Sequence, residues 1–170
     1  MENSDWIALG AFMTGIAALG TAAWEGVQNR KHNKLSLKPL LVFNYEEIAN
    51  NDDDEIKLTL TNCGAGVAVF TAVQVLLDAV ILEGNDAIAD ALFTLETVRT
   101  YQEPDDFKVF SATKGYALKN GSSINLFTIR NVKNTRANQI TADIKRRVII
   151  SVKFKSMYEE EDQVIFSLLD

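Results

Sequence analysis

The run of residues 6–24 constrains this chain most, because it is long enough to cross a membrane and carries no charge. It reads WIALGAFMTGIAALGTAAW and begins and ends with a tryptophan. A helix from Trp6 to Trp24 would be about 27 Å long, close to the roughly 30 Å hydrocarbon core of a bilayer. Tryptophans at both ends suit the aromatic belts at the two membrane interfaces. We therefore expect a single-pass transmembrane helix over residues 6–24.

The residues on the two sides of this run differ in charge. Residues 1–5 contain no Lys or Arg, so the positive n-region of a cleaved signal peptide is missing. The basic residues that follow the run are Arg30, Lys31, Lys34 and Lys38. The positive-inside rule then places residues 1–5 outside the cell and the rest of the chain in the cytoplasm. Residues 25–38 form a basic juxtamembrane tether, helical to about Asn33.

Two alternatives accompany this interpretation. The run is only moderately apolar, so a helix packed on a domain or on a partner is the other explanation for residues 6–24. The four basic residues that follow the run either set the topology alone or also contact anionic headgroups at the interface, at about 1 kcal/mol each; they are Arg30, Lys31, Lys34 and Lys38.

Small residues line part of the predicted helix. Ala11, Gly15, Ala18 and Ala22 follow helical spacing, and Gly10 and Thr14 begin a neighbouring stripe. Small side chains allow helices to approach closely in lipid, where no hydrophobic force drives association. The predicted helix-packing residues are Gly10, Ala11, Thr14, Gly15, Ala18 and Ala22. They predict self-association or docking on another membrane helix, and the alternative is a lone anchor rich in alanine.

The composition leaves few residues for catalysis or for binding transition metals. The chain has one cysteine, Cys63, and one histidine, His32, which lies in the tether. This excludes an internal disulfide, a cysteine-based metal site and a zinc site built on paired histidines. The formal net charge of −6 argues against nucleic acid as a partner, because nucleic acid binding depends on neutralising phosphates. We expect no cofactor and no enzymatic activity.

Residues 39–170 are predicted to form one domain built mainly from β-strands. Ile56, Leu58 and Leu60 alternate with polar residues, as in a half-buried strand. Ile124, Leu126 and Thr128 are expected to share one face of a strand over 123–130. Further strand-like runs occupy 40–48, 67–77, 80–84, 107–111, 148–157 and 163–168, the last two as a hairpin.

Two segments of this domain have helical or loop character. Residues 86–98 predict a short helix with Asp86 as its N-cap. Residues 131–138 predict a polar loop, followed by a short helix or an extended segment over 140–145. The fold class that follows is mainly β, with a transmembrane helix and then an immunoglobulin-like antiparallel β-sandwich carrying one or two short helices.

Several of these segments together resemble a known group of proteins. They are Lys38-Pro39-Leu40, the stretch 58–66 (LTLTNCGAG), the stretch 118–126 (LKNGSSINL) and the closing hairpin. In this order they resemble uncharacterised bacterial single-span membrane proteins with a cytoplasmic immunoglobulin-like sandwich. In that group Pro-Ala usually follows the glycine turn, whereas this chain has Val67-Ala68. The resemblance implies a fold and a topology, and it implies no catalytic residue.

Three features have a functional and a structural interpretation. The segment 62–66 (NCGAG) is rich in glycine like a phosphate loop, but it has no Lys, so we expect its glycines to serve turn positions with positive φ. Cys63 has no basic neighbour in sequence and is expected to be inert. The acidic runs 52–55 and 159–162 lack the spacing of a calcium loop and are expected to be solvated turns, which could face a basic partner.

The function expected from the sequence is that of a membrane-anchored, non-enzymatic protein-interaction or scaffold module, as part of a membrane complex. Its partners would be the lipid bilayer and either a protein partner or a second copy bound through the helix. The alternative is an oligomeric membrane effector or pore component, in defence or as a toxin, gated by its cytoplasmic domain.

Overall fold

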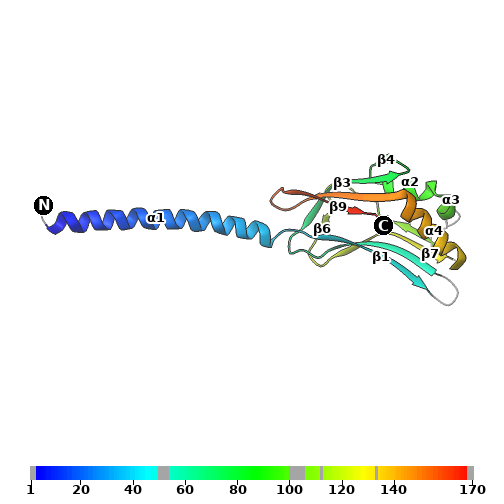
Figure 1. The fold of residues 1–170 in the computed structure, drawn as a ribbon, viewed down its shortest axis with the longest axis horizontal. Coiled ribbons are helices and arrows are strands. Elements are labelled where there is room, and N and C mark those ends of the chain that lie inside the picture. Colours follow the sequence, from blue (N-terminus) through cyan, green and yellow to red (C-terminus); the bar gives the residue numbers. More distant parts are fainter. Residues whose placement is uncertain (1–2, 50–53, 100–105, 112, 133, 168–170) are drawn as a thin grey trace. The chain divides into compact units, whose positions relative to one another are not determined.

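The computed structural model describes residues 3–49, 54–99, 106–111, 113–132 and 134–167 (Figure 1). The chain divides into two compact units, Met1–Leu37 and Lys38–Asp170. The first unit contains one long helix, and the second contains antiparallel β-sheets with three helices among its described residues.

Helix α1 spans Asn3–Ser36, and from Trp6 onward its side chains are exposed. It is long and apolar enough to cross a membrane, as the sequence predicts. The helix continues through the predicted tether to Ser36 rather than ending near Asn33. The N–H of Leu37 donates to the carbonyl of Asn33 at 3.1 Å, and Pro39 then disfavours helical backbone at the residue before it.

The second unit contains nine strands among the described residues. They are β1 (Leu41–Ala49), β2 (Asp54–Asn62), β3 (Ala68–Leu77), β4 (Val80–Glu83), β5 (Phe107–Val109), β6 (Ala117–Leu118), β7 (Ser123–Val132), β8 (Val148–Lys155) and β9 (Glu161–Phe166). One sheet has the order β1-β2-β7-β5, and the other has the order β4-β3-β8-β9, with β6 also pairing with β3. Every pair is antiparallel, and the hairpin of β8 and β9 is confirmed.

Side chains from both sheets meet in one hydrophobic core. Ile56, Leu58 and Leu60 of β2 are fully buried, which confirms the face predicted from their alternation. Aliphatic and aromatic side chains of β3, β7 and β8 complete this core, including Phe70, Val75, Phe127, Ile129, Ile150 and Val152. Burial of this apolar surface is the main force that holds the two sheets together.

The expected face of β7 is wrong beyond Ile124. Leu60 pairs with Ile124 and Leu58 pairs with Phe127, so β7 has one extra residue between these pairs. Because of this β-bulge, Phe127 comes onto the face that an unbroken alternation would assign to Leu126. Both Leu126 and Phe127 are fully buried, so a simple polar-out pattern does not hold there.

The domain has more helix than the sequence predicts. The predicted helix over 86–98 is two pieces, α2 (Ala87–Thr94) and α3 (Glu96–Arg99), separated by Leu95. Asp86 precedes α2 but makes no capping hydrogen bond, because its carboxylate accepts one from the hydroxyl of Ser111 instead.

The prediction of a polar loop over 131–138 is also wrong. Helix α4 spans Asn134–Arg147, and β7 extends to Val132. Ala137, Ile140 and Ile144 lie on one face of α4 and are buried in the core. The remaining residues of this helix are mostly polar. The short apolar stripe is therefore the only feature of the sequence here that indicates a helix.

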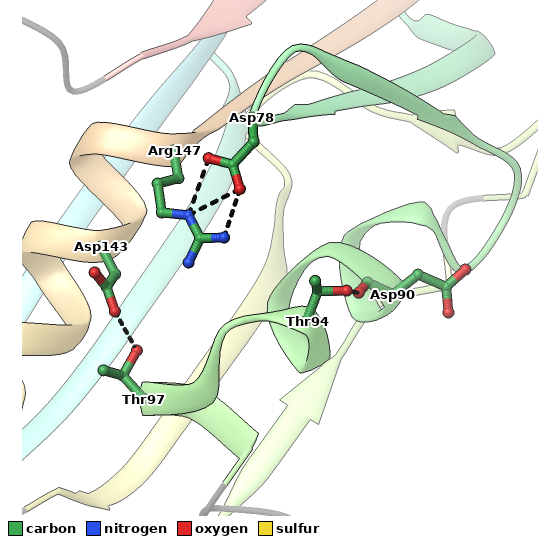
Figure 2. Close-up of polar contacts among 6 residues, drawn as sticks. All are labelled: Asp78, Asp90, Thr94, Thr97, Asp143 and Arg147. Atoms are coloured by element: carbon green, nitrogen blue, oxygen red, sulfur yellow. Dashed lines mark hydrogen bonds and ion pairs between the residues drawn. The ribbon is translucent and has the colours of Figure 1, made fainter.

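The helices and the β3–β4 turn are joined by polar contacts (Figure 2). Arg147, at the end of α4, donates from Nε to both carboxylate oxygens of Asp78 at 3.0 Å, and its Nη2 also contacts Oδ2. The hydroxyl of Thr97 in α3 donates to the carboxylate of Asp143 in α4 at 2.8 Å. These contacts hold the turn and α3 against α4.

The β3–β4 turn requires an unusual backbone conformation. Leu77 pairs with Val80, so Asp78 and Ala79 form a two-residue turn, with φ of 48° and 67°. Positive φ at both positions is typical of a type I′ turn, where Gly is favoured at the second position. Ala79 is exposed and has a Cβ that opposes this conformation.

We expect Ala79→Gly to stabilise the domain by about 1 kcal/mol, because glycine adopts positive φ without strain. Ala72→Gly is the matched control, since it lies inside β3 and is expected to destabilise by about 1 kcal/mol. Urea denaturation of the full chain in detergent measures the stability of both variants, with unfolding monitored by the circular dichroism of the β-sheets. A loss of stability in Ala79→Gly would contradict the strain argument.

The ion pair at this turn predicts a pH dependence. The hydrogen bond from Arg147 lowers the pKa of Asp78. A carboxylate with a lowered pKa in the folded state adds stability above its unfolded pKa of about 3.9, and that stability is lost as the pH falls through the folded pKa. We expect Asp78→Asn to be less stable than wild type at pH 7 and to approach it in acid. We expect Arg147→Gln to lose the same pH-dependent part of the stability. If the free energy of unfolding changed with pH in parallel for wild type and both variants, the predicted effect of this ion pair would be contradicted.

Candidate functional site

One buried side chain fixes the beginning of the domain to two distant segments. Asn62, the last residue of β2, is fully buried. Its Oδ1 accepts hydrogen bonds from the N–H of Leu40 at 3.2 Å and of Gly64 at 3.0 Å. Its Nδ2 donates to the carbonyl oxygens of Gly66 at 2.7 Å and Leu118 at 3.0 Å. These four bonds use the full capacity of the amide, and we call this arrangement the Asn62 clamp.

Gly64 makes the same region tightly packed. A Cβ at this position would lie 2.2 Å from N of Leu40, 2.5 Å from O of Lys38 and 2.6 Å from C of Pro39. The expectation that glycines of this loop serve positive φ is wrong. Within the described residues, the glycines with positive φ are Gly84, Gly115 and Gly121. Gly64 is needed because backbone approaches backbone, which leaves no room for a side chain.

A groove of about 470 Å³ opens beside the clamp, along strand β9. We call it the β9 groove, and it is lined by Lys38, Pro39, Leu40, Leu41, Phe154, Asp162, Gln163 and Val164. Leu41 and Phe154 are buried members of the core, so the interior of the groove is apolar. Hollows of about 290 Å³ and about 90 Å³ adjoin it and share Asp162 with it.

Asp162 connects the two sides of the β9 groove. Its Oδ2 lies 3.0 Å from Nζ of Lys38, and its Oδ1 accepts the backbone N–H of Gln163 at 2.8 Å. The hydrogen bond from Lys38, and after it the one from Gln163, lowers the pKa of Asp162. The carboxylate is therefore ionised at neutral pH.

Aromatic side chains pack between β1 and β9 at the end of β9 that is away from Asp162. The ring of Phe166 lies 5.4 Å from that of Phe43 and 6.1 Å from that of Tyr45, between centroids. The hydroxyl of Tyr45 is hydrogen-bonded to that of Thr141 in α4 at 2.8 Å, and burial raises the pKa of Tyr45 to about 12. Tyr45 is thus a neutral packing residue, and the space for a ligand lies at the Asp162 end.

The structure places the predicted membrane residues on α1. The helix-packing residues Gly10, Ala11, Thr14, Gly15, Ala18 and Ala22 are all exposed. A Cβ at Gly10 or Gly15 would meet nothing within 4 Å, and the hydroxyl of Thr14 donates to the carbonyl of Gly10 at 2.8 Å. The predicted interface residues Trp6, Trp24, Arg30, Lys31 and Lys34 are exposed on the same helix. Their roles in a membrane stay predictions.

The remaining candidates lie on loops of the domain. Cys63 is a free, exposed thiol. Of the acidic run 52–55, residues 52 and 53 lie outside the described residues, and Asp54 begins β2. The run 159–162 is exposed, with Glu159 at positive φ in the β8–β9 turn and Glu161 and Asp162 in β9. In the described part of the chain, no three His, Cys, Asp or Glu residues are grouped to hold a metal.

Sequence reasoning missed the residues that shape the β9 groove. The sequence places Lys38 in the tether and at the entry to the first strand, and Asp162 in an acidic run that could face a basic partner. An alternating reading of β9 places Asp162 on the same face as Val164 and Phe166, which marks a charge among core-facing positions. No pattern along the sequence brings Lys38 next to Asp162, because that contact depends on how the two sheets are joined.

No family model matches this chain, and no curated protein matches it. A solved crystal structure, that of Northeast Structural Genomics Consortium target SoR45, is similar to it with 11% sequence identity and a TM-score of 0.31. The similarity covers 79% of this chain and 84% of that chain. This level of similarity assigns no function to the chain.

Proposed function

We propose that this protein is a membrane-anchored, non-enzymatic interaction or scaffold module. Residues 6–24 of α1 cross the bilayer with the N-terminus outside, and the domain lies in the cytoplasm as an immunoglobulin-like sandwich. The apolar helix supports the anchor, and the excess of Lys and Arg after it supports the orientation. The two antiparallel sheets around one core support the sandwich.

The observation that carries this proposal is the β9 groove. It combines an apolar interior, a charged rim and an edge strand, which are the features of a surface that receives a peptide segment. The catalytic alternative has less support, because the carboxylate that lines the groove, Asp162, is held in an ion pair with Lys38. Pairing of this kind suits recognition better than proton transfer.

The orientation can be tested with the native cysteine. Cys63 is the single cysteine of the chain and is exposed, so a membrane-impermeant maleimide reports on its side of the membrane. We expect no labelling in intact cells and full labelling after lysis. A Cys63→Ser chain carrying Ser4→Cys is the matched control and should label in intact cells. Labelling of Cys63 in intact cells would reverse the proposed topology.

The proposed role is tested by the native mass of the full-length protein extracted in mild detergent, with co-purifying proteins identified. A discrete complex with another protein is the expected result. Recovery of this protein alone, as a monomer, would contradict a scaffold role. Recovery outside the membrane fraction would contradict the anchor.

A second candidate function is an oligomeric membrane effector or pore component. The observation that favours it is the stripe of exposed small residues on α1, which leaves space for a second helix at Gly10 and Gly15. A homo-oligomer in the native mass experiment, together with growth arrest and loss of membrane potential on expression, would select it. Normal growth with an intact potential would argue against it.

A further inference from the structure

The free edge of β9 is one of the long sheet edges of the domain. Among the described residues, the strands at the ends of the two sheets are β1, β5, β4 and β9. Strand β5 has three residues and β4 has four, whereas β9 has six and β1 has nine. Short edge strands offer little to pair with, but a long edge takes up another strand unless something blocks it. The β9 edge therefore needs a block.

Gln163 shows which backbone groups lie at this edge. Its N–H donates to Oδ1 of Asp162 at 2.8 Å, so it points away from β8, the strand with which β9 pairs. N–H groups alternate between the two edges of a strand, so those of Glu161 and Ile165 also point to the free edge. A further strand would form its hydrogen bonds with these three residues.

The β9 edge is complementary to a second copy of itself. In an antiparallel pair with its two-fold axis at Gln163, that residue faces its own copy and Glu161 faces Ile165. These are the residues whose N–H groups point outward, and the register sets no like charges directly opposite each other. Every molecule of this protein carries the same edge, so a second copy is the competitor that has to be kept away from it.

Asp162 opposes this pairing. It lies on the same face of β9 as Val164 and lines the β9 groove beside the buried side chains of Leu41 and Phe154. In the self-paired register, Val164 of the second copy would lie opposite Asp162 and enclose its carboxylate. Burying a charge without a partner is costly, and inward-pointing charges are one means by which proteins block sheet edges.

Lys38 offsets the charge of Asp162 in the single chain. Its Nζ lies 3.0 Å from Oδ2 of Asp162 across the groove, and both side chains are about half exposed. An exposed ion pair adds little to stability. A strand added at this edge would enter the groove and separate the two groups, so the carboxylate would lose its ion pair and its water together. The block is therefore cheap for the single chain and costly for a pair.

We propose that Asp162 blocks the free edge of β9 against pairing with β9 of a second copy, and that Lys38 offsets its charge only while the edge is empty. This inference goes beyond the proposed function, because it names a contact that the protein avoids.

The test is disulfide cross-linking of the full-length protein in neutral detergent, with Cys63→Ser to remove the exposed native thiol. Gln163→Cys places one thiol at the axis of the self-paired register, where the two Cα atoms would lie about 5.5 Å apart, within disulfide range. Adding Asp162→Ala should raise the yield of cross-linked dimer under mild oxidation at least about fivefold. Equal yields with and without Asp162 would overturn the proposal.

Ser151→Cys is the matched control for position. Ser151 lies on β8, opposite Ile165. Two copies paired through β9 keep these serines three strand spacings apart, about 14 Å, which is too far for a disulfide. The yield at this position should stay low with or without Asp162. A rise equal to that at Gln163→Cys would mean contact through another surface, such as α1, and would refute pairing through β9.

Lys38→Gln distinguishes the charge of Asp162 from its ion pair. The variant leaves the carboxylate charged and facing the groove, so the yield at Gln163→Cys should stay within about twofold of that with Lys38 present. A rise as large as that caused by Asp162→Ala would show that the ion pair, and not the inward charge, keeps the edge closed, which contradicts the proposal.

Hydrogen exchange gives a second measurement that needs no new thiol. In Asp162→Ala the Gln163 amide loses its acceptor and should exchange faster than in wild type at low protein concentration. The exchange should then slow as the concentration rises and pairs form, whereas in wild type it should not change. Exchange in the variant that is independent of concentration would count against pairing at this edge.

Discussion

Asn62→Ala should destabilise the domain by about 4 kcal/mol. The substitution leaves four backbone groups without their partner, the carbonyls of Gly66 and Leu118 in a buried region and the N–H of Leu40 and Gly64 in a partly buried one. Each buried polar group left unsatisfied costs about 1–3 kcal/mol, and water entering the vacated space recovers part of the total. Urea denaturation of the full chain in detergent, monitored by the circular dichroism of the β-sheets, gives the change in the free energy of unfolding.

Asn125→Ala is the control for this prediction. Asn125 lies on the exposed face of β7 and accepts one side-chain hydrogen bond, from Thr59 at 3.2 Å. Its replacement should cost less than about 1 kcal/mol. If the two variants had similar stability, the Asn62 clamp would contribute little, and the segment before β1 would be held mainly by apolar packing.

Gly64→Ala should cost about 3 kcal/mol, because the added methyl group meets backbone atoms of three residues. The shortest of these contacts would be 2.2 Å, to N of Leu40. To relieve this clash, the segment of Lys38 and Pro39 has to move away. That movement breaks the hydrogen bond from the N–H of Leu40 to the side chain of Asn62. Denaturation measured in the same way as for Asn62→Ala gives the size of the loss.

The matched control is Gly121→Ala. Gly121 has φ of 68°, and a Cβ there would meet nothing within 4 Å. Its replacement carries only the strain of the left-handed conformation, about 1 kcal/mol. A larger loss at Gly121 than at Gly64 would show that backbone strain, rather than close approach, controls this end of the domain.

The sequence predicts best where one local signal is enough. The alternation of Ile56, Leu58 and Leu60 identifies β2 and its buried face, because the side-chain period of a strand is two. The closing hairpin is also predictable, since two β-rich runs flank a short polar turn. Residues 6–24 also predict the long helix from a local signal, namely the length of the run and its lack of charge.

The elements that the sequence predicts poorly depend on contacts between distant residues. Helix α4 buries only a narrow stripe around Ile140 and Ile144, and its other residues are mostly polar. The sequence therefore resembles a polar loop more than an amphipathic helix. The bulge in β7 depends on the register of β7 against β2, which residues 123–130 alone do not reveal. The roles of Asn62 and Asp162 come from partners that lie far away along the chain.

The Asn62 clamp has a consequence for how the protein is made. Its carbonyl partner at Leu118 leaves the ribosome well after Leu40, by about 4 to 16 seconds at ordinary rates of synthesis. During that interval the start of the domain cannot be locked in place, whereas α1 is already complete. In the proposed topology, α1 would therefore be able to enter the membrane before the domain closes, and the growing chain would be held at the bilayer while the sheets assemble.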